Sequence, residues 1–205
     1  LLDRALQHDD INVSVRAIAL MRTPQGKGSR ITFSNLVVEQ LLDVVADDGA
    51  DVRVRREAVR TLMPLYEHDR RKLYSTLNEL GPAGSFAVQP VVEFLSDRSQ
   101  RHWAAGGAFD APVGAVELLA TWGADSAEAV PILVAIVEGE HPNGWSLAPA
   151  AAEALAAIGP KAASALPSLR MATSSSRSNV AKAARMAVEK LRRYDVTDAP
   201  VLQPL

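Results

Sequence analysis

The chain of 205 residues carries 22 lysines and arginines against 24 aspartates and glutamates, and 48% of its residues are hydrophobic, a composition typical of a folded, soluble protein. It has no run near the roughly 18 uninterrupted apolar residues that a membrane span needs, and its N-terminus lacks the pattern of a signal peptide. The absence of cysteine excludes disulfides and thiolate metal sites and fits a cytoplasmic protein.

The N-terminal half predicts amphipathic helices. The stretch "DVRVRREAVRTLMPL" opens at Asp51, a good N-cap, and places Val54, Ala58 and Leu62 on one stripe at helical spacing. The first residues, "LLDRALQHDD", already belong to such a pattern without an initiator methionine. We therefore expect the chain to be a piece of a longer protein.

Three similar stretches follow, "LGPAGSFAVQPVVEFL" from Leu80, "WGADSAEAVPILVAIV" from Trp122 and "IGPKAASALPSLRMA" from Ile158. In each, a glycine after a large apolar residue predicts the end of a helix, because glycine accepts the left-handed conformation that closes a last turn. The later proline in each stretch predicts a bend in the helix that follows. The recurrence of this stretch indicates an internal repeat.

The C-terminal half adds "SLAPAAAEALAAIG", expected to open at Ser146 with Pro149 in its first turn, and the amphipathic "SNVAKAARMAVEKL". Together these patterns predict about five helical hairpins in an all-α array over residues 1–193, with 194–205 as a tail or linker. The expected first helices span 1–8, 33–47, 84–96, 127–138 and 163–173, and their partners span 12–22, 52–67, 111–122, 147–158 and 179–193. An extra helix over 69–80 is expected as an insertion.

The unit around Asp51, Val54, Arg55, Ala58 and Leu62 resembles a HEAT repeat, in particular the short bacterial kind named after phycobilisome lyases. The residues around Val15-Arg16 match the same pattern weakly. The resemblance implies a right-handed α–α superhelix in which aspartate and arginine form a ladder between repeats. Later units have Pro112, Ala148 and Ala181 at the arginine position, so the ladder is not expected to continue there.

Catalytic motifs are missing from the sequence, which has no HExxH, no Gly-x-Ser-x-Gly, no phosphate-binding glycine loop and no cysteine nucleophile. The four histidines are far apart in the sequence, at or beyond predicted helix ends. We therefore expect no enzymatic activity, no cofactor and no metal site.

Two unusual loops, "SDRSQRHWAAGGAFD" and "EGEHPNGWS", join the helices of consecutive hairpins and are expected on the same edge of the array. This edge would bring together five candidate partner-binding residues, namely Arg101, His102, Trp103, His141 and Trp145. In the alternative interpretation each tryptophan folds back to anchor its own hairpin. A metal held by the two histidines is a third, less favoured interpretation.

Charge is segregated along the chain. Between His102 and Pro160 there is no lysine or arginine and there are seven acidic residues, whereas Lys161 to Arg193 contains eight basic residues and only Glu189 as an acid. A candidate basic face consists of Arg53, Arg56, Arg60, Lys182 and Arg185. Ordinary solvation of polar helix faces is the alternative explanation.

These observations predict a non-enzymatic scaffold or adaptor that presents a curved helical surface and the Trp/His edge to another protein or to another domain of a longer chain. Segregated charge also permits association of two copies of the chain. Nucleic-acid binding through basic helix faces is the less favoured alternative, because the acidic stretch interrupts a positive channel. The resemblance implies one further alternative, an accessory subunit of a bilin-lyase-like enzyme. No membrane partner is expected.

Overall fold

A computed structural model describes residues 2–6, 8, 10–21, 33–65, 67–97, 110–142 and 144–195. Throughout these residues the regular elements are helical. In chain order they are α1 (Leu2–Leu6), α2 (Ile11–Met21), α3 (Asn35–Ala46), α4 (Val52–Leu62), α5 (Glu67–Glu79), the 3₁₀ segment η1 (Gly81–Ala87), α6 (Val88–Ser96), α7 (Asp110–Trp122), η3 (Gly123–Ala129), α8 (Val130–Val137), α9 (Gly144–Ile158), η4 (Gly159–Ala165), α10 (Leu166–Ala172) and α11 (Ser178–Asp195).

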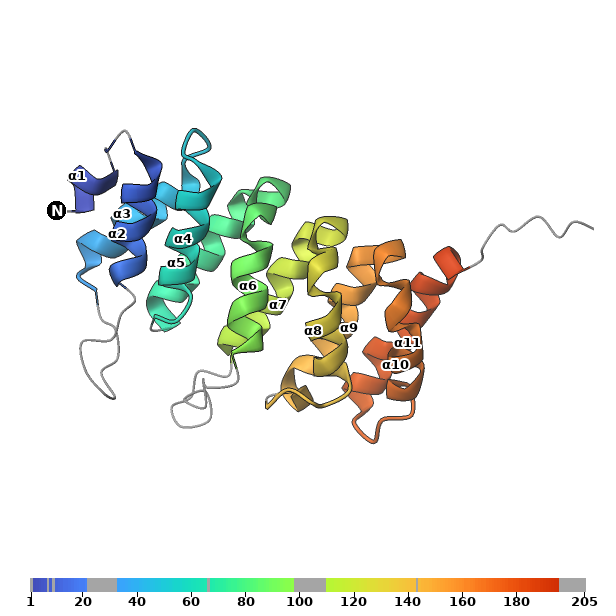
Figure 1. Ribbon diagram of the computed structural model, residues 1–205. Coiled ribbons are helices and arrows are strands. Elements are labelled where there is room, and N and C mark those ends of the chain that lie inside the picture. The colour runs from blue at the N-terminus through green and yellow to red at the C-terminus, as the bar shows by residue number, and fades with distance from the viewer. Residues whose placement is uncertain are drawn as a thin grey trace, which may run out of the picture.

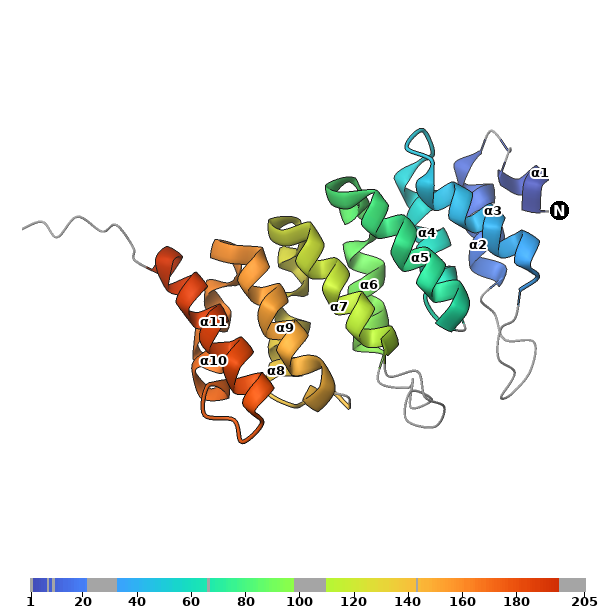
Figure 2. The ribbon, with the colours of Figure 1, turned by 180° about the vertical axis from the view of Figure 1, so that it is seen from behind.

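The helices stack in two layers along an elongated array (Figure 1). In the first layer α2 contacts α4, α4 contacts α6, α6 contacts α8 and α8 contacts α10. In the second layer the contacts run from α3 to α5, α7, α9 and α11, and Figure 2 shows this layer from its own side. The chain alternates between the layers, so the architecture is the predicted all-α solenoid.

The pairing of helices differs from the prediction in the N-terminal half. The segment 33–47 was expected as a first helix and 69–80 as an insertion, but α3 and α5 both belong to the second layer, in line with α7, α9 and α11. Thus α5 is a regular member of the repeat and α4–α5 is a regular unit. The layer of a helix depends on which neighbours its apolar stripe meets, and Leu73 and Leu77 of α5 are fully buried.

Three equivalent corners join the second layer to the first. Each is a seven-residue 3₁₀ segment that begins with a glycine of positive φ, namely Gly81 at 52°, Gly123 at 53° and Gly159 at 73°. Residues with a Cβ rarely adopt this conformation, so glycine ends the preceding helix here. The predicted helix ends and the predicted repeat are both confirmed at these corners.

The prolines of the three repeated stretches do not bend a helix, contrary to the prediction. Pro131 and Pro167 occupy the first turn of α8 and α10, and Pro90 is the third residue of α6. An N–H in the first turn has no partner within the helix, so proline costs little there. The residues before each proline, which were assigned to the helix, form the 3₁₀ corner instead.

The start of α9 also differs from the prediction. The helix begins at Gly144 rather than at Ser146, so Pro149 lies inside it, past the first turn. Proline there cannot donate the backbone hydrogen bond to the carbonyl of residue 145. The first turn of α9, which carries Trp145, is therefore held less tightly by its own helix.

The core runs through the whole array as one cluster of buried apolar side chains, from Ile18 in α2 to Leu191 in α11. Leu62, Leu119 and Leu155, from successive units, are each fully buried. Burial of a leucine contributes roughly 1.5–3 kcal/mol relative to an exposed one. The predicted continuous apolar seam between neighbouring hairpins is confirmed in the described residues.

The C-terminal helix is slightly longer than predicted. The array was expected to end at residue 193, whereas α11 continues through Asp195. The remaining part of the predicted tail, 196–205, lies outside the described residues.

One stretch, Val113–Val137, is long and apolar enough in composition to cross a membrane. Its residues do not form one straight helix, because α7 ends at Trp122 and Gly123 turns the chain into η3. The helix that follows, α8, packs in the opposite layer. The apolar composition of this stretch thus belongs to two helices on different sides of the array.

Candidate functional site

One long edge of the array carries the connection from α8 to α9 and the connection from α10 to α11 (Figure 1). The Nε2 atom of His141, in the first connection, lies 2.9 Å from the carbonyl oxygen of Leu95 near the end of α6. A carbonyl only accepts hydrogen bonds, so Nε2 is the donor. His141 therefore ties its connection to the preceding unit.

Trp145, the second residue of α9, is 53% exposed on this edge. The guanidinium carbon of Arg177, just before α11, lies 5.9 Å from the centroid of its ring, within the range of a cation–π contact. Trp145 is thus half-exposed at this edge, with Arg177 of the next unit over its ring. We call Trp145 and Arg177 the Trp145 edge.

Three of the predicted partner-binding residues, Arg101, His102 and Trp103, lie outside the described residues. The prediction that these three residues lie beside His141 and Trp145 therefore falls outside the described residues and stays a prediction. The structure does place His141 against the end of α6, where the first of the two predicted loops begins.

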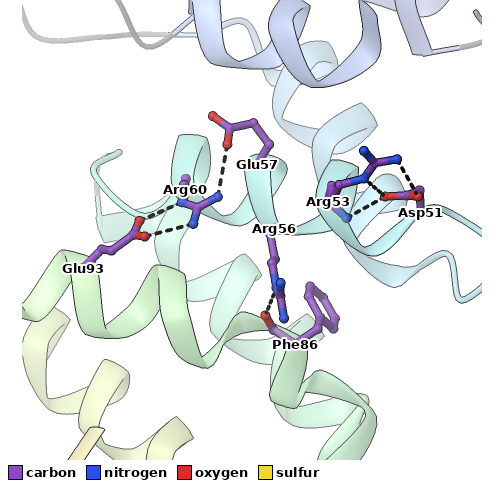
Figure 3. A network of polar contacts seen from close by, with 7 residues as sticks. All are labelled: Asp51, Arg53, Arg56, Glu57, Arg60, Phe86 and Glu93. Carbon is purple, nitrogen blue, oxygen red and sulfur yellow. Dashed lines mark hydrogen bonds and ion pairs between the residues drawn. The ribbon is translucent and has the colours of Figure 1, made fainter. Parts of the chain in front are cut away.

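Arg53, Arg56 and Arg60 lie on one side of α4 as predicted, but their charges are bound within the array (Figure 3). Arg56 donates through Nε to the carbonyl of Phe86, at 2.9 Å. Arg60 donates to both carboxylate oxygens of Glu93, at 2.7 and 2.9 Å, and its pKa is raised mainly by these bonds. Arg56 and Arg60 therefore connect α4 to the next unit, whereas Arg53 pairs with Asp51 at the start of α4 and stays 56% exposed.

The aspartate–arginine ladder that the HEAT resemblance implies is not formed at Asp51 and Arg55. Asp51 accepts the backbone N–H of Arg53 at 2.8 Å, as the predicted N-cap, and its carboxylate also binds the Arg53 side chain. Both interactions lower the pKa of Asp51, the side-chain bond more strongly. The unit of α4 is joined to the next unit instead by Arg60, which binds Glu93, and by Arg56, which donates to the carbonyl of Phe86.

Arg55 has a role that the sequence did not reveal. Its guanidinium donates through Nε and Nη2 to the carbonyl of Val45, at 3.1 and 2.8 Å, and stacks over the Phe86 ring at 4.1 Å. The motif marked Arg55 as important, but no sequence pattern identified its acceptor. Arg177 was also missed. It lies in the α10–α11 connection, one unit after the loop that contains Trp145, and this position could have indicated that it lies near Trp145.

Lys182 and Arg185, the other predicted basic residues, are exposed on α11 at the C-terminal end of the array. Arg185 donates through Nε to the carbonyl of Ala181, one turn earlier. This side of α11 lies far along the array from α4, so the predicted basic residues form two separate sites.

The part of the chain that the structure describes contains no group of three or more His, Asp or Glu side chains placed to hold a metal ion. His141, the one histidine of the predicted edge in this part, is bonded to a backbone carbonyl.

We expect Arg60→Ala and Glu93→Ala to be coupled by only about 0.5–1 kcal/mol in a double-mutant cycle, because the two side chains are 21% and 46% exposed. The coupling should fall as salt is raised, which urea unfolding at two ionic strengths will measure. Arg53→Ala combined with Glu93→Ala is the control, because Arg53 binds Asp51. A zero coupling at low salt would contradict a connecting role.

Comparison with solved structures finds engineered and designed proteins. Two engineered proteins of the Northeast Structural Genomics Consortium are 17% and 16% identical to the chain, each with a TM-score of 0.35, over 94% of this chain and 97% and 96% of theirs. A designed armadillo repeat protein is 17% identical, with a TM-score of 0.32, over 93% of this chain and 98% of its own. No protein-family model and no curated protein matches the sequence.

The class of the protein follows from its own architecture. Equivalent glycine corners, two alternating layers and one continuous core make the chain an all-α helical repeat protein.

Proposed function

We propose that this protein is a non-enzymatic scaffold of the HEAT type that holds a partner protein, or another domain of a longer chain, at the Trp145 edge. The observation that carries the proposal is the exposed Trp145 with Arg177 over its ring, at the junction of two units. Tryptophan and arginine are the residue types that most often dominate interface energies. The HEAT assignment rests on the motif of α4 and on the stacked helical units.

A protein partner is favoured over a nucleic acid by the arrangement of charge. Arg56 and Arg60 are bound to the next unit, and the α7–α9 region exposes Glu117, Glu128 and Glu153. A polyanion needs a contiguous positive channel, since neutralisation of phosphates supplies most of its affinity. Carboxylates in the middle of the array oppose such a channel.

Replacement of Trp145 by alanine is expected to leave the free energy of unfolding within about 1 kcal/mol of the wild type, because half of the side chain is already in water. The same change should abolish capture of the partner by the immobilised protein from extracts of its native source. Arg177→Ala should weaken capture less, because it removes one side of a cation–π contact. Thermal unfolding and quantitative pull-downs will measure the two effects.

Val52→Ala is the matched control, because Val52 is a similarly exposed apolar residue at the start of α4, away from this edge. It should retain the partner. If Trp145→Ala instead lowers stability by more than about 2 kcal/mol and retains every partner, the tryptophan is an anchor and the proposed function is wrong.

A further inference from the structure

The last helix of the second layer, α11 (Figure 2), carries a row of exposed side chains on its outer side. Lys182, Met186, Lys190 and Arg193 follow one another at spacings of four, four and three residues, which places them on one face of the helix. Met186 is 59% exposed in the middle of the three cations. We call these four residues the Met186 stripe.

The positive charge of the Met186 stripe is not neutralised by the described part of the protein. Ion pairs within the described residues include none of its three cations. Two carboxylates are exposed on the neighbouring surface, Glu153 on α9 and Glu189 on α11. They do not balance the five exposed cations of α11, which are the three of the stripe together with Arg185 and Arg192. The stripe therefore attracts a negatively charged partner.

The exposed methionine suits a partner that is not only charged. Methionine is flexible and polarizable, so it adapts to the shape of an apolar group placed on it. A partner that carried charge alone would leave Met186 in water. The stripe therefore favours a partner with carboxylates arranged around an apolar side chain.

We propose that the Met186 stripe binds an acidic amphipathic helix of a partner protein. Its carboxylates would meet Lys182, Lys190 and Arg193, and its central apolar side chain would cover Met186. The distance along the axis of α11 from Lys182 to Arg193 is roughly 17 Å, which about three turns of a partner helix match.

The inference goes beyond the proposed function and does not rest on it. The start of the stripe adjoins the Trp145 edge, but neither Trp145 nor Arg177 belongs to it. Lys190 lies roughly 20 Å beyond Arg177 along the axis of α11.

Two other classes of negatively charged partner fit the stripe less well. A DNA duplex along the second layer would meet the exposed carboxylates of Glu117 on α7 and Glu153 on α9, and its phosphates gain nothing from Met186. A helix on a membrane surface needs a broad apolar face directed at the lipid, whereas the apolar side of α11 is buried in the core. An acidic amphipathic helix uses both the cations and the methionine.

Fluorescence anisotropy with a labelled peptide tests the proposal on the whole chain. The probe is an alanine-rich peptide of about 18 residues, long enough to form a helix alone, with glutamates on one face around a central leucine. The wild type should bind it at about 50 mM NaCl, with a dissociation constant that rises at least about fivefold at about 300 mM NaCl. A peptide with glutamine in place of each glutamate should bind at least about tenfold more weakly.

Charge reversal locates the site. Lys182→Glu/Lys190→Glu should weaken binding at least about tenfold, because carboxylates would then flank Met186. Arg4→Glu/Arg16→Glu is the matched control, because it changes the net charge by the same amount at exposed residues of α1 and α2, and it should bind like the wild type. Circular dichroism checks folding, and the uncharged Lys182→Gln/Lys190→Gln should weaken binding about threefold if the reversal variant does not fold.

The contact with Met186 distinguishes a specific site from general attraction between charges. Met186→Gln, which keeps the length of the side chain, should weaken binding of the leucine peptide about threefold to tenfold. It should have little effect on a peptide with alanine in place of the leucine, because no apolar contact is then left to lose. Trp145→Ala should bind the leucine peptide as the wild type does, which separates this site from the proposed scaffold site.

Four results would overturn the proposal. They are a wild type that does not bind the acidic peptide at low salt, an affinity that reversal of Lys182 and Lys190 leaves unchanged, effects of Met186 and of the leucine that are not coupled, and loss of peptide binding in Trp145→Ala. A short DNA duplex and vesicles containing phosphatidylserine are the competing probes. If either displaces the peptide and binds more tightly than it does, the stripe is a nucleic-acid or membrane site and the proposal is refuted.

Discussion

Replacement of Arg55 by methionine is expected to lower the free energy of unfolding by about 2–3 kcal/mol, although methionine has a similar length and suits a helix. The carbonyl of Val45 lies in the last turn of α3. Carbonyls in a last turn receive no hydrogen bond from a backbone N–H of the same helix. Arg55 supplies two hydrogen bonds to the Val45 carbonyl, and a charged donor makes each bond stronger. Methionine would leave this carbonyl buried without a donor.

The Phe86 ring adds to the effect, since Arg55 stacks on it at 4.1 Å and thereby links α4 to η1 of the next unit. Such contacts contribute about 0.5–2 kcal/mol depending on burial. Burial of the guanidinium acts in the opposite direction, and desolvation lowers the pKa of Arg55. The bonds to Val45 and Phe86 must therefore outweigh the cost of desolvating the charge.

Urea unfolding monitored by circular dichroism will measure the change. An unchanged slope of the unfolding free energy against urea concentration will indicate that the folded state is the same. Arg53→Met on the same helix is the control and should alter stability by no more than about 0.5 kcal/mol, because Arg53 is exposed. A more stable Arg55→Met protein would show that desolvation dominates, as it does for some buried charges.

Replacement of Gly114 by alanine should lower stability by about 1–3 kcal/mol, even though alanine favours a helix by about 1 kcal/mol over glycine. A Cβ at this position of α7 would lie 2.6 Å from Cδ2 and from Cε2 of Tyr74 on α5. The Tyr74 ring packs against the core, and burial raises the pKa of its hydroxyl. Either the Tyr74 ring or the two helices must shift to accommodate the methyl group.

The measurement is again urea unfolding, now with a second substitution that removes the clash. Gly114→Ala should cost less in a Tyr74→Leu background, because the ring edge that the Cβ meets is gone. Gly49→Ala is the control, because its Cβ would meet only the Asp47 carboxylate, at 3.2 Å. If Gly114→Ala is stabilising, the ring moves freely and α5 and α7 are packed loosely.

Much of the fold could be predicted because its signals are local. The glycine corners and the amphipathic stripes depend on residues within a few turns of one another, and they indicated the helices and the repeat correctly. The layer to which α3 and α5 belong depends on distant neighbours. The segment 69–80 was therefore assigned to an insertion that accounts for the long spacing between units, although Leu73 and Leu77 connect it to the core.

The candidate site was less predictable for the same reason. Helical spacing placed Arg56 and Arg60 on one face. It did not show that Glu93 and the Phe86 carbonyl of the next unit lie within hydrogen-bond distance of them. The contact of Trp145 involves Arg177, which belongs to another unit. Contacts between units decide which charged side chains remain available, and periodicity within a helix does not report them.

The corners at Gly123 and Gly159 start in the same backbone conformation, and the same sequence of 3₁₀ segment, proline-initiated helix and long helix follows each one. A cut at both glycines therefore removes one complete module in frame and joins two matching ends. Duplication of the same module would lengthen the molecule by one module and would also join matching ends. Recombination at these codons can thus change the reach of the protein while the packing within each remaining module is retained.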